Sequence, residues 1–381
     1  MMSESLLMIP GPTNISERVR EVMSRPQQGH GSPEFTEKFG EMLKLARFAF
    51  KNNNGSQFVF TGSGTLAMEA SVVSTVQPGD RVLVLDTGYF GQRMVSINET
   101  HGAQVSQLQY PIGTHANPDD LRRKLRDDNF RAVFITHVDT GSAVVNPIKE
   151  LVEECKSAGV FSVVDSVCGL AGEELDFDSL GADIVFTASQ KAIAAPPGAV
   201  LIAVSNELLE YFQKRAKPIE GWYLNLLRWK PIMDDPKVYL ATPAVQIMLA
   251  LREALLELKE EGIEERWKRH RVLAGSIREG LQRMDVKFVA EEGYRANTLT
   301  GFIVKDGKAP EVQKELRDAH KIEVARGLAD YSGKMIRIGH MGILNAEQAD
   351  RTVRAVSETL AKLGITAPVP APSGRPKNPG P

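Results

Sequence analysis

Two residues of this sequence could carry chemistry because each stands at or just after the end of an apolar run. Lys191 lies in FTASQKAIAAPPG (186–198), where Ala, Ile and Pro neighbours would desolvate its ammonium group. Desolvation lowers the pKa of a lysine from ~10.4 and makes the neutral amine a nucleophile for carbonyl groups. Asp165 ends the apolar run in VVDSVCG (163–169), where a carboxylate needs a cationic or hydrogen-bonding partner. Taken singly, a solvated lysine and a capping aspartate are the simpler interpretations.

A third feature is the glycine-rich turn in FTGSGTLAMEA (60–70), which joins an apolar run to a helical pattern. The backbone N–H groups of Ser63, Gly64 and Thr65 would face outward at the start of the helix, which favours binding of one phosphate. The turn lacks the lysine of a nucleoside-triphosphate loop and the third glycine of a dinucleotide site. A tight turn with a helix N-cap explains it equally well.

Together, a phosphate cradle, a carboxylate and a lysine at the rim of one sheet are the groups that hold pyridoxal phosphate. The lysine forms the Schiff base, the acid keeps the pyridine nitrogen protonated, and the helix start binds the phosphate. TGYFGQR (87–93) adds aromatic rings that could stack on the cofactor, and THVDTG (136–141) adds His137, Asp139 and Thr140 near its phenolic oxygen. For Phe90 and His137, ordinary core packing is the competing interpretation.

The elements that must position these residues are strands alternating with helices over the first two thirds of the chain. Several strands are apolar throughout, which is typical of strands buried on both faces of a parallel sheet. We therefore expect an α/β, doubly wound, mostly parallel sheet with its ligand beyond the carboxyl ends of the strands. The expected strands are 57–61, 81–86, 104–109, 132–137, 161–165, 183–188 and 199–204.

After residue 205 the pattern changes to a Trp-rich, Pro-punctuated segment (221–236) and then to a smaller α+β arrangement. Its expected helices are 244–261, 264–284, 311–320 and 346–363, and its expected strands are 286–290, 299–304 and 335–339. The expected divisions are an N-terminal segment (1–17) reaching the small domain and the active site, a large domain (18–260), a small domain (261–365) and a disordered Pro-rich tail (366–381).

Composition excludes several classes of protein. The chain has 381 residues and a formal net charge of -2, which gives no electrostatic reason to expect nucleic acid or a membrane surface as partner. No apolar run approaches the ~20 residues of a membrane helix, and the N-terminus lacks a signal-peptide pattern. Two cysteines provide neither a disulfide framework nor a complete zinc site. We expect a cytoplasmic, two-domain protein without a bound metal.

At this point the sequence resembles class V aminotransferases of fold type I, in particular the alanine/serine–glyoxylate (or pyruvate) aminotransferase group. The motifs PGPTN, GSGT, GYFGQR, THVDTG, VDSVCG, SQKAIAAPPG, TPA and RIGHMG occur in family order from residue 9 to about residue 363. The resemblance implies a large pyridoxal-phosphate domain with a mostly parallel seven-stranded sheet and a smaller C-terminal α+β domain. It also implies a homodimer with shared active sites.

Carried over residue by residue, the resemblance makes Lys191 the Schiff-base lysine and Asp165 the partner of the pyridinium nitrogen. Arg337 would clamp the substrate α-carboxylate, and Gly11 would line the substrate pocket. The remaining implied cofactor contacts are Ser63, Gly64, Thr65 and Gln190 at the phosphate, Phe90 and Val167 on the two ring faces, Thr140 near the phenolic oxygen, and Tyr239 and Thr242 reaching the neighbouring subunit's phosphate.

The sequence departs from the family at Gly31, where many relatives carry an arginine. Loss of that anion contact favours a small neutral donor such as alanine or serine, with glyoxylate or pyruvate as acceptor in a ping-pong reaction. His30 could still reach the pocket, although a turn histidine is an equally good interpretation.

Four other functions are weighed against this one. Ureidoglycine is an alternative donor, and a cysteine desulfurase-like lyase would need a mobile thiolate, for which Cys155 and Cys168 look poorly placed. A binding protein that has lost catalysis is disfavoured by retention of Lys191, Asp165 and Arg337. A dehydrogenase fits GSGTLA badly, although Asp86 does end a strand.

Overall fold

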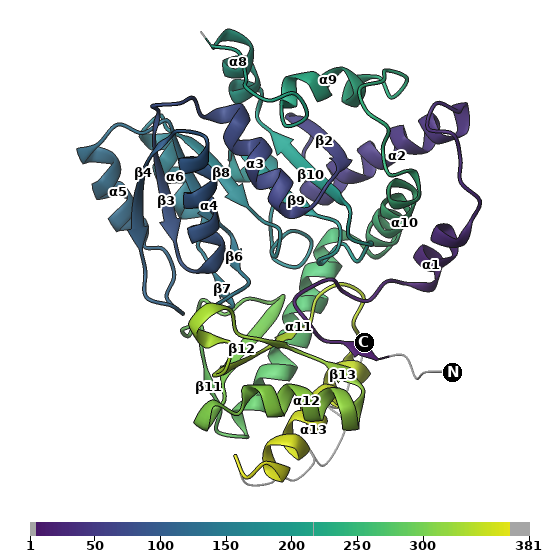
Figure 1. Cartoon of the computed structure of the whole chain (residues 1–381), viewed down its shortest axis with the longest axis vertical. Helices are drawn as coiled ribbons and strands as arrows, with labels where there is room; N and C mark the ends of the chain where they lie inside the picture. The colour runs from purple at the N-terminus through teal and green to yellow at the C-terminus, as the bar shows by residue number, and fades with distance from the viewer. Residues whose placement is uncertain (1–4, 216, 366–381) are drawn as a thin grey trace, which may run out of the picture.

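The computed structural model describes residues 5–215 and 217–365. The proline-rich tail for which disorder was predicted (366–381) lies outside the described residues. Two assemblies of elements share the chain, and Figure 1 shows the larger one above the smaller one. We call them the large unit and the small unit.

The large unit is built on a seven-stranded sheet in the order β2-β10-β9-β8-β5-β3-β4. Its strands are β2 (Ser56–Thr61), β10 (Ala199–Val204), β9 (Ile184–Ala188), β8 (Phe161–Asp165), β5 (Ala132–Thr136), β3 (Arg81–Asp86) and β4 (Gln104–Gln109). All neighbours are parallel except β10, which is antiparallel to both β2 and β9. Every side chain of β5, β9 and β10 is buried, which explains their continuous apolar runs. The predicted mostly parallel, seven-stranded sheet is confirmed.

Helices cover this sheet on both faces. They are α2 (Pro33–Phe50), α3 (Gly64–Thr75), α4 (Tyr89–Thr100), α5 (Pro118–Asp127), α6 (Ile148–Ser157), α7 (Phe177–Leu180), α8 (Asn206–Lys214), α9 (Leu226–Asp234) and α10 (Val245–Glu261). The crossover through α4 leads from β3 to β4, whereas those through α5, α6 and α7 run in the opposite direction across the sheet. Because such crossovers are right-handed, α4 lies on one face and α5 to α7 lie on the other.

The small unit is a four-stranded sheet, β11-β12-β15-β14, packed against three helices around its own apolar core. Its elements are α11 (Ile263–Gln282), β11 (Lys287–Phe288), β12 (Leu299–Ile303), α12 (Ala309–His320), β14 (Ala325–Arg326), β15 (Met335–Gly339) and α13 (Ala346–Lys362). The first turns of α11 pack into the core of the large unit through Ile263 and Trp267. The predicted domain limits at 260 and 261 therefore stay predictions.

The N-terminal segment joins the small unit. Strand β1 (Leu6–Leu7) pairs in parallel with β13 (Ile322–Glu323), and the helix α1 (Glu17–Ser24) follows it. Residue Met8 belongs to the apolar core of the small unit. The start of the chain therefore packs beside residues that come more than 300 positions later.

One predicted strand is shorter than expected. The pattern at 286–290 predicts five strand residues, but β11 contains only Lys287 and Phe288. Val289 N–H still donates to the Gly301 carbonyl of β12 at 3.0 Å, but the residues after it contact the large unit, where Glu291 N–H donates to the Gly113 carbonyl at 2.9 Å. A contact between distant segments therefore overrides the local preference.

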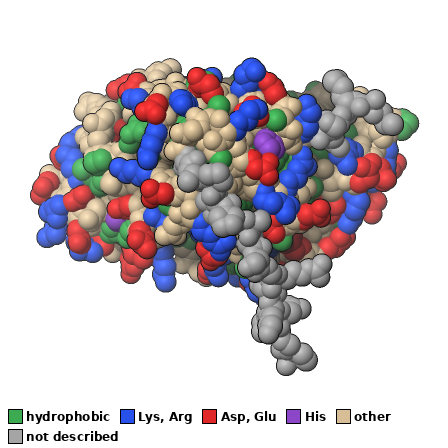
Figure 2. Space-filling view, turned by 90° about the horizontal axis from the view of Figure 1, so that it is seen from below, with side chains coloured by type: hydrophobic (Ala, Val, Ile, Leu, Met, Phe, Trp, Pro, Cys, Tyr) green, Lys and Arg blue, Asp and Glu red, His purple; other side chains and the backbone are tan. Residues whose placement is uncertain are grey.

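The surface carries interspersed charges. On the face at the small-unit end, acidic and basic side chains alternate without a large area of one sign (Figure 2). No helix of the described residues is long and apolar enough to cross a membrane.

Candidate active site

Lys191 and Asp165 emerge at the same edge of the large sheet, because the strands that precede them, β9 and β8, are parallel neighbours. Lys191 is half-buried, and its Nζ donates to the Pro10 carbonyl oxygen. The Lys191 carbonyl in turn accepts from Thr13 Oγ1 at 3.0 Å. The N-terminal segment thus holds the lysine from one side.

Gly11 lies directly against this lysine. Its φ of +110° is a conformation that favours glycine, and a methyl group at this position would lie 2.7 Å from Lys191 Cδ. The predicted place of Gly11 beside the site is therefore supported by contact, although a role in binding substrate stays a prediction.

Asp165 is a buried carboxylate with few protein partners. Its Oδ1 accepts from the Val167 N–H at 2.9 Å. Burial raises the pKa of Asp165 to about 6, the Val167 bond opposes this rise, and the negative charge of Asp139 adds to it. A cationic group beside this carboxylate would offset the cost of its burial. The protonated ring nitrogen of pyridoxal phosphate is a group of that kind.

The glycine-rich turn has the geometry of an anion cradle. Among the described residues, the backbone N–H groups of Ser63, Gly64 and Thr65 have no acceptor, and α3 begins at Gly64. A methyl group at Gly64 would lie 3.3 Å from Val167 Cγ2, so the helix start adjoins the turn that follows Asp165. In the described chain the buried Oε1 of Gln190 also lacks a partner. The unpaired N–H groups fit a phosphate, whereas the Oε1 of Gln190 is an acceptor, so only the amide nitrogen of Gln190 could donate to one.

Phe90 lies at the start of α4 and is half-buried. Its N–H donates to Asp139 Oδ2 at 3.4 Å, and the same carboxylate accepts from Ser142 N–H at 2.7 Å. Asp139 is fully buried, and burial raises its pKa. This carboxylate therefore fixes the turn before α4 to the turn that contains Thr140.

Arg93 is a site residue that the sequence analysis missed. Its guanidinium lies 4.8 Å from the ring centroid of Phe90, and its Nη1 donates to Thr65 Oγ1 at 3.1 Å. It therefore links the aromatic position to the helix start of α3. The signal was present in GYFGQR, because residues three apart on a helix share a face.

Arg337 comes from the small unit, in the middle of β15. Its side chain is 7% exposed, and burial lowers its pKa. Nε donates to the Arg326 carbonyl and Nη1 to the Thr140 carbonyl, both at 2.8 Å. In the described part of the chain Nη2 has no partner. A buried guanidinium with an unpaired nitrogen is suited to a carboxylate ligand.

Cys168 shows that these groups converge. Burial raises the pKa of its thiol, and the nearby charge of Lys191 opposes that rise. Cys168 and the Asp139 carboxylate also lie close enough to Arg337 to oppose the lowering of its pKa. Lys191 and Asp165 interact electrostatically at the carboxyl edge of the sheet, and Arg337 reaches the Thr140 turn there, although the three residues come from distant parts of the chain.

His137 is a core histidine and no site group. Its ring is buried, Nδ1 lies 2.9 Å from Ser166 Oγ, and burial lowers its pKa to about 3. A methyl group at Gly169 would overlap the imidazole. The ring is neutral and supports the turn that follows Asp165.

Tyr239 and Thr242 lie on the loop between α9 and α10. Tyr239 is 64% exposed, its hydroxyl lies 3.2 Å from Thr242 Oγ1, and its ring packs 5.3 Å from that of His30. A side chain at Gly31 would enter open space. Within one described chain, His30 contacts Tyr239 instead of the lysine.

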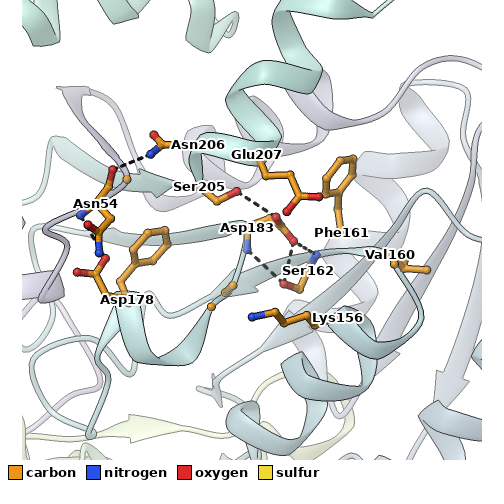
Figure 3. A pocket seen from close by; sticks show the side chains of 15 residues that line it. Asn54, Lys156, Val160, Phe161, Ser162, Asp178, Asp183, Ser205, Asn206 and Glu207 are labelled. Carbon is orange, nitrogen blue, oxygen red and sulfur yellow. Dashed lines mark hydrogen bonds between the residues drawn. The ribbon is translucent and has the colours of Figure 1, made fainter.

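A separate pocket of about 260 Å³ lies at the opposite edge of the sheet, between the starts of β8 and β9 and the start of α8 (Figure 3). Asp183 in this pocket is already bonded to Ser162 N–H at 2.9 Å and Ser205 Oγ at 3.0 Å. The strands separate it from Lys191, so it is not part of the candidate active site.

The carboxyl edge of the large sheet therefore gathers a lysine, a buried carboxylate and a free helix start, and the small unit supplies an arginine. On this sheet, that set of groups defines the fold type I enzymes that depend on pyridoxal phosphate. The chain belongs to the class V aminotransferase family, whose model matches residues 14–354.

Known proteins of this family are similar over nearly the whole chain. An alanine–glyoxylate aminotransferase of Saccharomyces cerevisiae is 36% identical over 361 residues, which cover 90% of this chain and 93% of that protein. The structure of an alanine–glyoxylate aminotransferase from Nostoc sp. has a TM-score of 0.90 at 31% identity and covers 94% of this chain and 96% of its own. The ureidoglycine–glyoxylate aminotransferase of Bacillus subtilis has a TM-score of 0.92 at 27% identity, with 96% of each chain covered.

These similarities confirm the fold class, the cofactor and the type of reaction expected from the sequence. The protein is a pyridoxal-phosphate-dependent transaminase.

Proposed function

We propose that this enzyme transfers the amino group of alanine or serine to glyoxylate or pyruvate. The observation that carries the proposal is Arg337, whose buried guanidinium offers an unpaired nitrogen to the carboxylate that all these substrates share. Gly31 supports a small neutral side chain on the donor, because it provides no cation for a second carboxylate. The alanine–glyoxylate aminotransferases among the similar proteins agree with this choice.

The proposed cofactor contacts are supported by the groups gathered at the carboxyl edge of the large sheet. Pyridoxal phosphate, when bound, supplies an electrophilic aldehyde and a ring that accepts electrons from the substrate Cα. Lys191 is the attachment residue and Asp165 holds the ring nitrogen protonated. The other proposed contacts are Ser63, Gly64, Thr65 and Gln190 at the phosphate, Phe90 and Val167 on the ring faces, and Thr140 near the phenolic oxygen.

Lys191 performs the proton transfers. With the cofactor bound, the Nζ of Lys191 would move the proton between the substrate Cα and the cofactor. The Pro10 carbonyl, which accepts from this Nζ, would help to hold the amine at the site. Arg337 holds the α-carboxylate in the same place for amino and keto acids, so one pocket serves both halves of a ping-pong reaction.

Two alternatives differ in their support. Ureidoglycine as donor is supported by the similar Bacillus subtilis structure. A desulfurase is not supported, since that chemistry needs a mobile, exposed thiolate. Both cysteines are buried, and burial raises the pKa of each thiol.

We also propose a homodimer in which Tyr239 and Thr242 reach the partner's cofactor phosphate. Their exposure and their place on the loop between α9 and α10 support this assignment. Exposed Val238 lies beside them and would be covered by a second copy.

The decisive experiment is a matrix of amino donors and keto acceptors with the purified holoenzyme, with Lys191→Ala as the inactive control. Alanine or serine with glyoxylate or pyruvate should be among the best pairs. Borohydride reduction followed by peptide mass spectrometry should locate the cofactor on Lys191. Turnover of acidic or aromatic donors only would contradict the inference from Gly31 that the donor has a small neutral side chain. An adduct on another lysine would contradict the assignment of Lys191.

A further inference from the structure

A buried carboxylate outside the cofactor contacts lies where the two units meet. Glu173 follows the turn after β8, and its N–H donates to the Gly169 carbonyl at 2.7 Å. Its side chain is 5% exposed. A buried carboxylate is costly unless its oxygens are well satisfied, so its partners indicate what it is for.

All of the hydrogen-bond partners of this carboxylate come from one short segment that leads into β12. Its Oε1 accepts from the Asn297 backbone N–H, and its Oε2 accepts from Asn297 Nδ2 at 2.7 Å. The Thr298 N–H also donates to it. The positive charge that acts on it belongs to Arg278 of α11, which donates to the Ala296 carbonyl at 2.8 Å. Glu173 of the large unit therefore holds the residues that lead directly into β12 of the small unit.

The segment that Glu173 holds is connected to the strand of Arg337. In β12, Gly301 is the register partner of Arg337. His340, which follows β15, lies with Nδ1 2.9 Å from the Asn297 carbonyl and Nε2 2.9 Å from Thr300 Oγ1. Burial lowers the pKa of His340 to about 3, so its ring is neutral, with Nδ1 donating and Nε2 accepting.

Close packing leaves little freedom at this junction. A methyl group at Gly172 would overlap the Thr298 side chain and would lie 3.3 Å from Ala192 Cβ, next to Lys191. On the other side, Ala296 N–H donates to the Ala143 carbonyl at 3.1 Å. A shift of Asn297 would therefore be transmitted to both sheets.

We propose that Glu173 is a positioning residue of the substrate site, which fixes the start of β12 against the turn after Asp165 and so sets Arg337 relative to Lys191. The inference rests on the proposed role of Arg337 as the carboxylate clamp. Glu173 touches neither substrate nor cofactor and acts through Asn297.

The first test compares Glu173→Ala with Glu174→Ala in the holoenzyme. Glu174 is the adjacent carboxylate, 74% exposed and 3.8 Å from Arg271, so it controls for loss of charge. Glu173→Ala should raise KM for the amino acid and the keto acid roughly tenfold, because a small misplacement of a binding group weakens both substrates. Bound cofactor and kcat should change less than about threefold. Glu174→Ala should leave KM unchanged.

The second test exchanges donor and acceptor. Asn297→Asp places a second carboxylate against Glu173 and, assayed well above pH 7 where Glu173 is ionised, should raise KM at least as much as Glu173→Ala. Adding Glu173→Gln should restore KM to within about threefold of wild type. The new amide would donate to the new carboxylate, while its carbonyl still accepts the backbone N–H of position 297.

The outcomes separate this role from a purely structural one. Unchanged KM in Glu173→Ala, an equal loss of kcat and cofactor, or a double variant no better than Asn297→Asp would each overturn the proposal. Propionate is a carboxylate without an amino group, so its binding does not depend on which amino donor the enzyme uses. Its Kd is measured from the change in cofactor absorbance. If propionate binds more weakly to Glu173→Ala while no proposed donor turns over, the positioning role stands and the substrate assignment fails.

Discussion

At the scale of single residues, the chemistry was predictable where a polar residue ends or follows an apolar run. Lys191 and Asp165 both satisfy that rule, and the parallel pairing of β8 and β9 brings them to one edge. Arg93 and Glu173 do not follow such a pattern. The one local sign of Arg93 is its three-residue spacing from Phe90. The contacts of Arg93 with Thr65 and of Glu173 with Asn297 join residues 28 and 124 positions apart, which the local sequence does not show.

The carboxylate of Asp165 gives the first prediction at this scale. Asp165→Asn should lower kcat by about 100-fold or more, because a neutral amide does not keep the ring nitrogen protonated. The variant should still bind pyridoxal phosphate, since the phosphate cradle is intact. Asp183→Asn, at the opposite edge of the sheet, is the matched control. Steady-state kinetics and cofactor absorbance check both variants, and a fully active Asp165→Asn enzyme would remove this residue from the site.

Arg337 gives the second prediction. Arg337→Ala should lower kcat/KM for every carboxylate substrate by two or more orders of magnitude, or about 3 kcal/mol. Arg337→Lys should recover only part of this loss, because an ammonium lacks the planar fork of a guanidinium. Arg326→Ala, whose side chain is exposed on the neighbouring strand, should have normal kinetics. Normal kcat/KM in Arg337→Ala would refute the clamp.

At the scale of elements, strands buried on both faces were predictable almost to the residue. The runs at 81–86, 161–165 and 199–204 coincide with β3, β8 and β10. The two-residue strands β1 and β13 were not predicted, because each exists only through pairing with the other across the chain. Helix α4 lies between β3 and β4 as the alternation predicts, but its start at Tyr89 was not predicted, because GYFGQR was interpreted only as an aromatic position.

The N-terminal turn gives a prediction at this scale. Gly11→Ala should reduce the fraction of chains that carry covalently attached cofactor roughly tenfold, because the new methyl group displaces Lys191 and strains the left-handed backbone. Gly29→Ala, where a methyl group meets no atom within 4 Å, is the control. Borohydride labelling measures the attached cofactor, and equal labelling of the two variants would show that Gly11 does not constrain the lysine.

At the scale of the whole molecule, the junction between the units should make stability depend on pH. Burial raises the pKa of Glu173 to about 7 from 4.5, so the folded state favours the neutral acid. The contribution of this group to the free energy of unfolding is complete below pH 4.5 and is lost as pH rises through 7, by up to about 3 kcal/mol. The Tm of Glu173→Gln should therefore rise relative to the Tm of the wild type between pH 5 and pH 8, whereas the Tm of Glu174→Gln should not.

The shared site of the proposed dimer is also tested on the whole molecule. Lys191→Ala and the double variant Tyr239→Ala/Thr242→Ala should each have little activity alone. When the two variants are refolded or co-expressed in equal amounts, half of the dimers are hybrids. Each hybrid has one site with an intact Lys191 from one chain and intact Tyr239 and Thr242 from the other. The mixture should therefore have about a quarter of wild-type activity. A mixture no more active than the sum of its components would mean that each chain builds its own site. This part of the site could not be predicted from contacts within one chain.

The pairing of β1 with β13 has a consequence for how the protein is made. Leu6 leaves the ribosome more than 300 residues before its partner Ile322 is synthesised. Until then the nascent chain can assemble the cofactor-binding sheet while Leu6 and Leu7 have no strand to pair with. The turn that presses on Lys191 is thus fastened only after the last strands of the small unit have been made.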